Sequence, residues 1–175
     1  MAVRHYISAA DGENSVGGAA RLKELLAQPG AKRATVDPVK LESVLNNVTG
    51  DVRSAINHDW DIDAFDALWF NQTINGVAPP AIPMDDSDKA TLVTNAKMLF
   101  AYWAWKEGAE AQAMPQVVGD DRKAALENLR ALGMRLKGWG SQRKPATQRH
   151  FKLGQPLTPG HHPAGGHRSK FEGFK

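Results

Sequence analysis

The chain has 175 residues, no cysteine and a hydrophobic content of 42%, which is enough to bury a core. The missing cysteines exclude disulfides, thiol catalysis and thiolate metal sites. The net charge of +3 conceals two unlike parts, since residues 1–140 carry 15 Lys and Arg against 18 Asp and Glu, whereas residues 141–175 carry 7 against 1. A net charge of +6 at one end predicts a tail that meets an anionic surface, either nucleic acid or an acidic protein face.

No apolar run of signal-peptide length occurs near the N-terminus, and the longest apolar stretch, around residues 98–105, is far shorter than the roughly 20 residues that span a membrane. We therefore expect a soluble, unexported protein without a membrane partner. Residues 1–18 are polar and glycine-rich and predict an irregular arm. Residues 19–27 predict a short helix that presents three leucines and ends before Pro29 and Gly30.

A long amphipathic helix is predicted over residues 37–57. Asp37 is placed to cap it, and Pro38 occupies the first helical position, where the missing N–H costs nothing. Gly50 interrupts the apolar period and indicates a bend or a close helix crossing.

Residues 58–84 break the helical period and predict a long loop, with Asn75-Gly76 and several prolines that allow at most a short hairpin. Its large apolar side chains are expected to cover the helical core or to contact a neighbouring subunit. The candidates for subunit contact are Trp60, Phe65, Trp69 and Phe70.

Residues 86–111 predict the central core helix, with Asp86 or Ser87 as N-cap. Tyr102, Trp103 and Trp105 cannot all face one side of it, so it must be covered by more than one partner. After a turn at residues 115–119, a further helix is predicted from Asp120 to about residue 139.

The remaining residues, 141–175, are rich in proline and glycine and cannot build a core of their own. They predict either a disordered terminus or an extended docking arm. The candidate partner-binding residues of this arm are six of its seven bases and its three phenylalanines: Arg143, Lys144, Arg149, Phe151, Lys152, Arg168, Lys170, Phe171 and Phe174. The predicted fold is therefore all-α. It is a small bundle of three main helices and a short N-terminal helix over residues 1–140, with a long loop and an extended C-terminal arm.

The motifs of common catalytic and cofactor sites are missing from the sequence, which carries no Walker loop, dinucleotide fingerprint, HExxH or GxSxG. Asp59, Asp61 and Asp63 alternate as in a calcium loop, but the sixth and twelfth positions hold Ala64 and Phe70 instead of Gly and Glu. A second candidate metal site, His161, His162 and His167, has glycine-rich flanks that give no ligand geometry. We expect no enzyme activity, cofactor or metal.

The order of these elements over residues 6–140 resembles the head-to-tail adaptor (connector) proteins of tailed bacteriophages, particularly the Mu-like connector family. The resemblance rests on the helix that opens at Asp37-Pro38 and ends in DVRSAI (residues 51–56), on a proline-bearing loop, and on two later helices. The first of these carries Leu92, Ala96, Leu99 and Tyr102, and the second carries Arg122, Ala125, Leu129, Leu132 and Gly133. The Trp-rich loop and the long tail depart from the family pattern.

The resemblance implies a structural virion protein of the neck region, made in the bacterial host cytoplasm. It implies a homo-oligomeric ring of twelve copies beneath the portal protein, joined on its other side to a tail-side neck or stopper protein. DNA would pass through the lumen without specific recognition. The alternative is a non-specific nucleic-acid-binding protein that acts through its basic tail, for which salt-sensitive affinity is expected.

Overall fold

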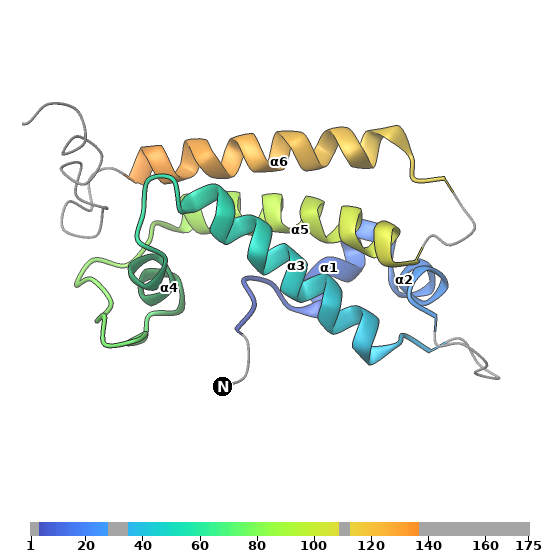
Figure 1. Cartoon of the computed structure of the whole chain (residues 1–175), viewed down its shortest axis with the longest axis horizontal. Coiled ribbons are helices and arrows are strands. Elements are labelled where there is room, and N and C mark those ends of the chain that lie inside the picture. The colour runs from blue at the N-terminus through green and yellow to red at the C-terminus, as the bar shows by residue number, and fades with distance from the viewer. Residues whose placement is uncertain (1–3, 28–34, 109–112, 137–175) are drawn as a thin grey trace, which may run out of the picture. The chain divides into compact units, whose positions relative to one another are not determined.

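The structure is a computed structural model that describes residues 4–27, 35–108 and 113–136 (Figure 1). Within these ranges the chain forms six α-helices and one short 3-10 helix, with no β-strand. The elements are α1 (Ala9–Glu13), η1 (Asn14–Val16), α2 (Ala19–Leu25), α3 (Pro38–Ile56), α4 (Ile62–Phe70), α5 (Asp86–Gly108) and α6 (Gln116–Arg135). The predicted all-α class is confirmed, as are the three main helices, now α3, α5 and α6, and the short helix α2.

Helix α5 is the centre of the bundle. It packs against α3 and α6 and also against α1, η1 and α2 (Figure 1). Leu92, Leu99 and Phe100 have no exposed surface, and burying each such side chain contributes roughly 1.5–3 kcal/mol. The prediction that this helix is covered on several sides is confirmed.

Helix α3 begins as the sequence predicts. The Asp37 carboxylate accepts the Val39 N–H at 2.9 Å, and Pro38 occupies the first turn. The prediction of a close helix crossing at Gly50 is wrong, because a Cβ placed on this glycine would meet no atom within 4 Å. Among the helical glycines, Gly133 of α6 lies in ordinary contact with α3, since an added Cβ would be 3.5 Å from Ile56 Cδ1, whereas a Cβ on Gly108 of α5 would be 2.0 Å from the Leu25 carbonyl oxygen.

The starts of the other two long helices differ from the prediction. Helix α5 is capped one residue earlier than expected, since Asp85 accepts the Ser87 N–H at 3.0 Å. Helix α6 starts at Gln116 and not at Asp120, because Pro115 with φ −58° already leads the chain into the helix without a side-chain cap. The predicted turn over residues 115–119 is therefore mostly helical.

Two helices were not predicted. In α1, Ser8 and Asp11 form a capping box, in which the Asp11 N–H donates to Ser8 Oγ and the Ser8 N–H donates to Asp11. In α4, Asp61 accepts the N–H groups of Asp63 and Ala64 at 3.1 and 3.2 Å. The first part of the expected loop is thus helical, whereas residues 71–85 form a non-helical connection that contains a tight turn.

That turn is the short hairpin that the sequence allowed. Ile74 and Val77 exchange two backbone hydrogen bonds of 2.9 and 2.8 Å. Asn75 and Gly76 between them both have positive φ, of 46° and 86°, which is the conformation of a two-residue type I′ turn.

A pair of glycine variants tests the helix packing. Gly50→Ala should raise the free energy of unfolding by about 0.5–1 kcal/mol, because alanine favours the helix and the site is open. Gly108→Ala should lower it by about 1–3 kcal/mol, because the new Cβ would lie 2.0 Å from the Leu25 carbonyl oxygen. Urea denaturation measures both values, and shifts of the same sign would contradict this assignment of the open and the close-packed glycine.

Candidate interaction surfaces

The predicted docking arm lies outside the described residues. This applies to every one of its candidate residues, from Arg143 to Phe174, and equally to His161, His162 and His167. Their roles stay predictions from sequence.

Two of the four aromatic residues proposed for subunit contact belong to the protein's own core. Trp60 and Phe65 are 0% exposed and pack edge to face with ring centroids 6.2 Å apart. The Trp60 indole N–H donates to the Gly133 carbonyl at 3.1 Å, which satisfies an acceptor in the last turn of α6. In this fold neither side chain reaches a second subunit, because both rings are buried in the protein's own hydrophobic core.

The other two aromatic residues, Trp69 and Phe70, are partly buried at the end of α4. Both pack on Tyr6, with ring centroids 6.0 Å away for Trp69 and 5.7 Å away for Phe70. The Arg4 guanidinium lies 5.8 Å from the centre of the Phe70 ring. Trp69 and Phe70 therefore remain candidates for contact with another subunit.

A buried polar bridge joins the N-terminal residues to α4 and α3. The Tyr6 hydroxyl donates to one oxygen of Asp66, and Arg53 donates to the other at 2.6 Å. Tyr6 and Asp66 are each 3% exposed, so both depend on these partners for the hydrogen bonds that water would otherwise supply. Burial raises the pKa of Tyr6 far above its ordinary value, and the neighbouring Asp66 raises it further while Arg53 acts against both.

The aspartates that resemble a calcium loop serve the local fold instead. Asp61 caps α4, Asp63 accepts from the Asn75 side-chain amide at 3.0 Å, and Asp59 lies 3.3 Å from His58. Across the described ranges, no group of three or more acids and histidines is arranged to hold a metal ion.

A second cluster ties α3, α5 and α6 together. Asp51 accepts from the Trp103 indole N–H at 3.0 Å and from Arg122 at 3.2 Å. The Arg122 guanidinium also lies 4.6 Å from the centre of the Tyr102 ring, and Lys106 lies 4.7 Å from that of Trp103. The two cations thus cover the partly buried aromatic rings, and this arrangement favours a structural role.

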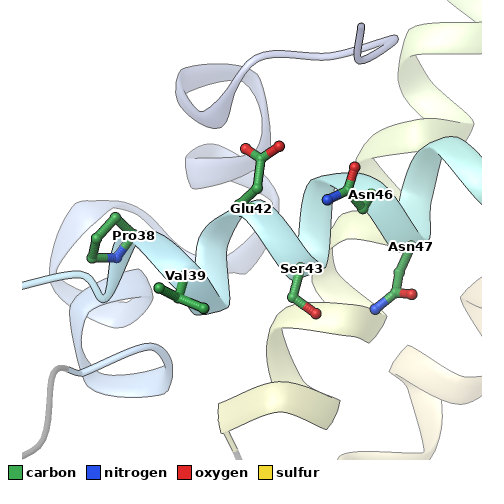
Figure 2. A pocket seen from close by; sticks show the side chains of 6 residues that line it. All are labelled: Pro38, Val39, Glu42, Ser43, Asn46 and Asn47. Carbon is green, nitrogen blue, oxygen red and sulfur yellow. The ribbon is translucent and has the colours of Figure 1, made fainter. Parts of the chain in front are cut away.

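The outer face of α3 carries an open hollow of about 530 Å³, and its lining residues follow one another along a single helix (Figure 2). They form two neighbouring rows spaced four residues apart: Pro38, Glu42 and Asn46 in one, and Val39, Ser43 and Asn47 in the other. A groove between two such rows is the feature into which a second helix packs. The Ser43 hydroxyl donates to Glu107 of α5 at 2.8 Å, so it is already engaged.

Among the described residues, four large apolar side chains are exposed. Val39 at the start of α3 is 76% exposed, Ile82 before α5 is 71%, and Val117 and Met134 near the two ends of α6 are 61% and 47%. They come from three different segments: α3, the loop before α5, and α6. In the part of the chain that is described, no helix is both long and apolar enough to cross a bilayer.

Sequence reasoning missed the Tyr6–Asp66–Arg53 bridge. Tyr6 lies 60 positions from Asp66, and no local periodicity links them. One signal was available: Tyr6 and Ile7 are apolar and directly precede the Ser8–Asp11 capping pair, which marks an ordered helix start rather than a loose arm.

The raised pKa of Tyr6 gives a test at alkaline pH. The phenol of the unfolded chain ionises near pH 10, whereas the buried phenol of the folded protein stays neutral. The stability that the neutral Tyr6 phenol gives the folded protein is therefore complete below about pH 10, and it falls as the pH rises further. Between pH 8 and pH 11 the natural protein should lose about 1 kcal/mol more unfolding free energy than Tyr6→Phe. Urea denaturation at both pH values measures the difference. Equal losses in the two proteins would mean that Tyr6 ionises as freely in the folded state as in the unfolded chain.

Comparison of the chain with protein-family models, with curated proteins and with solved structures found no match.

Proposed function

We propose that this chain is a structural head-to-tail adaptor, a ring-forming subunit that joins the capsid vertex of a tailed phage particle to its tail. The observation that carries the proposal is the difference in net charge and composition between the two parts of the chain. Residues 1–140 have a net charge of −3 and include the helical bundle, and residues 141–175 have a net charge of +6 and hold three spaced phenylalanines. A body followed by a basic arm with apolar anchors suits a subunit that docks on a neighbour.

The helical bundle supports the proposal in two ways. Its order of long helices, with the Asp37-capped α3, the central α5 and the closing α6, follows the layout on which the resemblance to connector proteins rests. Its exposed apolar side chains are spread over different elements, at Val39, Ile82, Val117 and Met134. A ring subunit presents unlike surfaces to its two neighbours, and such contacts are each small and strong only together.

In this proposal the partners are other copies of the chain, twelve in the ring, the portal protein on one side and a neck or stopper protein on the other. DNA passes through the ring without being read. The chain is made in the host cytoplasm, ends in the neck of the virion and carries out no catalysis.

Non-specific nucleic-acid binding is the competing function, and six of the seven arm bases, Arg143, Lys144, Arg149, Lys152, Arg168 and Lys170, are the candidates that favour it. The net negative charge of residues 1–140 opposes it, since it repels phosphates. Affinity would therefore rest on the arm alone and would fall steeply with salt.

Two full-length variants separate the functions. In the first, Phe151, Phe171 and Phe174 are changed to Ser, and in the second these six of the seven arm bases are changed to Gln. The assays are binding to the portal protein encoded in the same phage genome and binding to duplex DNA across a salt series.

We expect the natural chain to bind the portal protein. The phenylalanine variant should lose at least tenfold in that affinity, because its apolar anchors are gone. The same variant should keep the weak DNA affinity of the natural chain.

Electron microscopy of the natural chain bound to the portal is the companion measurement and should show a closed ring. Nanomolar DNA binding by the natural chain at physiological salt, lost in the glutamine variant and combined with no portal binding, would overturn the adaptor proposal in favour of the alternative.

A further inference from the structure

Residues 4–8, which we call the N-terminal strap, lie between α3 and α4 and contact both. On the α3 side, the two ring nitrogens of His5 lie 3.2 Å from Thr49 Oγ1 and 3.3 Å from Glu42 Oε1. On the α4 side, the Tyr6 ring packs on aromatic rings of α4 and its hydroxyl donates to Asp66. The strap thus makes its main side-chain contacts with one helix of the bundle and with one helix outside it.

Helix α4 lies below the end of α3, at the left of the view in Figure 1, beside the segment that leads into α5. Asp66 on its inner side pairs with Arg53 of α3 at 2.6 Å. Phe65, the fully buried aromatic residue of α4, packs on Trp60 and on Tyr6 of the strap, with centroid distances of 6.2 and 6.0 Å. Tyr6 therefore supplies both a packing surface and a hydrogen bond to α4.

The three-helix bundle has its own ties, which do not involve the strap. Asp51 of α3 binds Arg122 of α6, and the Asn128 side-chain amide of α6 donates to Asn95 of α5 at 3.1 Å. The start of α5 is also joined to the end of α6 by the Asp88–Arg135 pair. Loss of the strap would leave these interactions in place.

We propose that the strap and α4 unfold locally as one unit while the α3–α5–α6 bundle stays folded. The Tyr6–Asp66–Arg53 bridge holds this unit closed, and we call it the latch. Proteins open locally in cooperative units whose free energies are smaller than that of global unfolding. When this unit opens, Asp66 loses the hydroxyl of Tyr6 and the rings of Phe65, Trp69 and Phe70 lose their cover. The inference holds for the chain on its own and does not rest on the adaptor function.

Hydrogen–deuterium exchange of the full-length natural chain, measured over a low range of urea concentrations, tests the unit directly. Amides of α4 should exchange through openings with a weak urea dependence, whereas amides in the middle of α5 and α6 should exchange only through global unfolding with a strong dependence. If the α4 amides showed the same free energy and the same urea dependence as those of α5 and α6, the proposal would be overturned.

The latch is tested by Tyr6→Phe, with Tyr102→Phe as the matched control on the chain's other tyrosine. Removing the Tyr6 hydroxyl should speed exchange in α4 by about tenfold and change exchange in α5 and α6 by less than threefold. The control should leave exchange in α4 unchanged, because Tyr102 packs on Trp103 and Arg122 and not on α4.

Should Tyr6→Phe fail to fold, His5→Gln loosens the strap from α3 and leaves the buried bridge intact. It should speed exchange in α4 by a few fold and leave the bundle amides unaffected. For either variant, equal acceleration in α4, α5 and α6, or none in α4, would overturn the proposal that the strap contacts hold α4 closed.

Discussion

The fold depends on the enclosure of α5. A helix with apolar and aromatic side chains on several sides cannot be stable at a surface, so each of its sides requires a covering element. Helices α3 and α6 supply two of them, and the short N-terminal helices supply the third. There the Phe100 ring lies so close to Gly12 that a Cβ on this glycine would come within 2.6 Å of it. The short N-terminal helices are therefore part of the core.

The long helices could be predicted because their signals are local. Asp37 and Pro38 mark the start of α3, and apolar residues at steps of three and four mark its buried face. Helix α4 was missed because residues 58–84 taken together break the helical period and carry several prolines, although Asp61 as a cap followed by Phe65 and Leu68 also fits a short helix. Gly50 shows the limit of the same reasoning, since a glycine in a sequence does not tell whether a neighbour lies close to it.

The candidate surfaces were harder to predict than the helices. An aromatic residue in an apparent loop has the same sequence signature whether it fills its own core, as Trp60 does, or stays partly exposed, as Trp69 does. What separates them is distance in space: Trp60 meets α6 through Gly133, which is 73 positions away. Asp66 behaves similarly, because its partners Tyr6 and Arg53 lie 60 and 13 positions away in the sequence and only folding brings them near. Charge segregation, by contrast, is a property of the sequence itself, and the functional proposal rests mainly on it.

The bond between the Trp60 indole and the Gly133 carbonyl has a mechanical consequence. Tension on the chain beyond Leu136 would enter the fold at the last turn of α6, where a helix ordinarily frays because its carbonyls lack partners. Here one of those carbonyls is held by a buried side chain from the segment joining α3 to α4, and Arg135 is held by Asp88 at the start of α5. A pulling load would therefore be shared among three parts of the bundle from the outset, instead of peeling α6 away turn by turn.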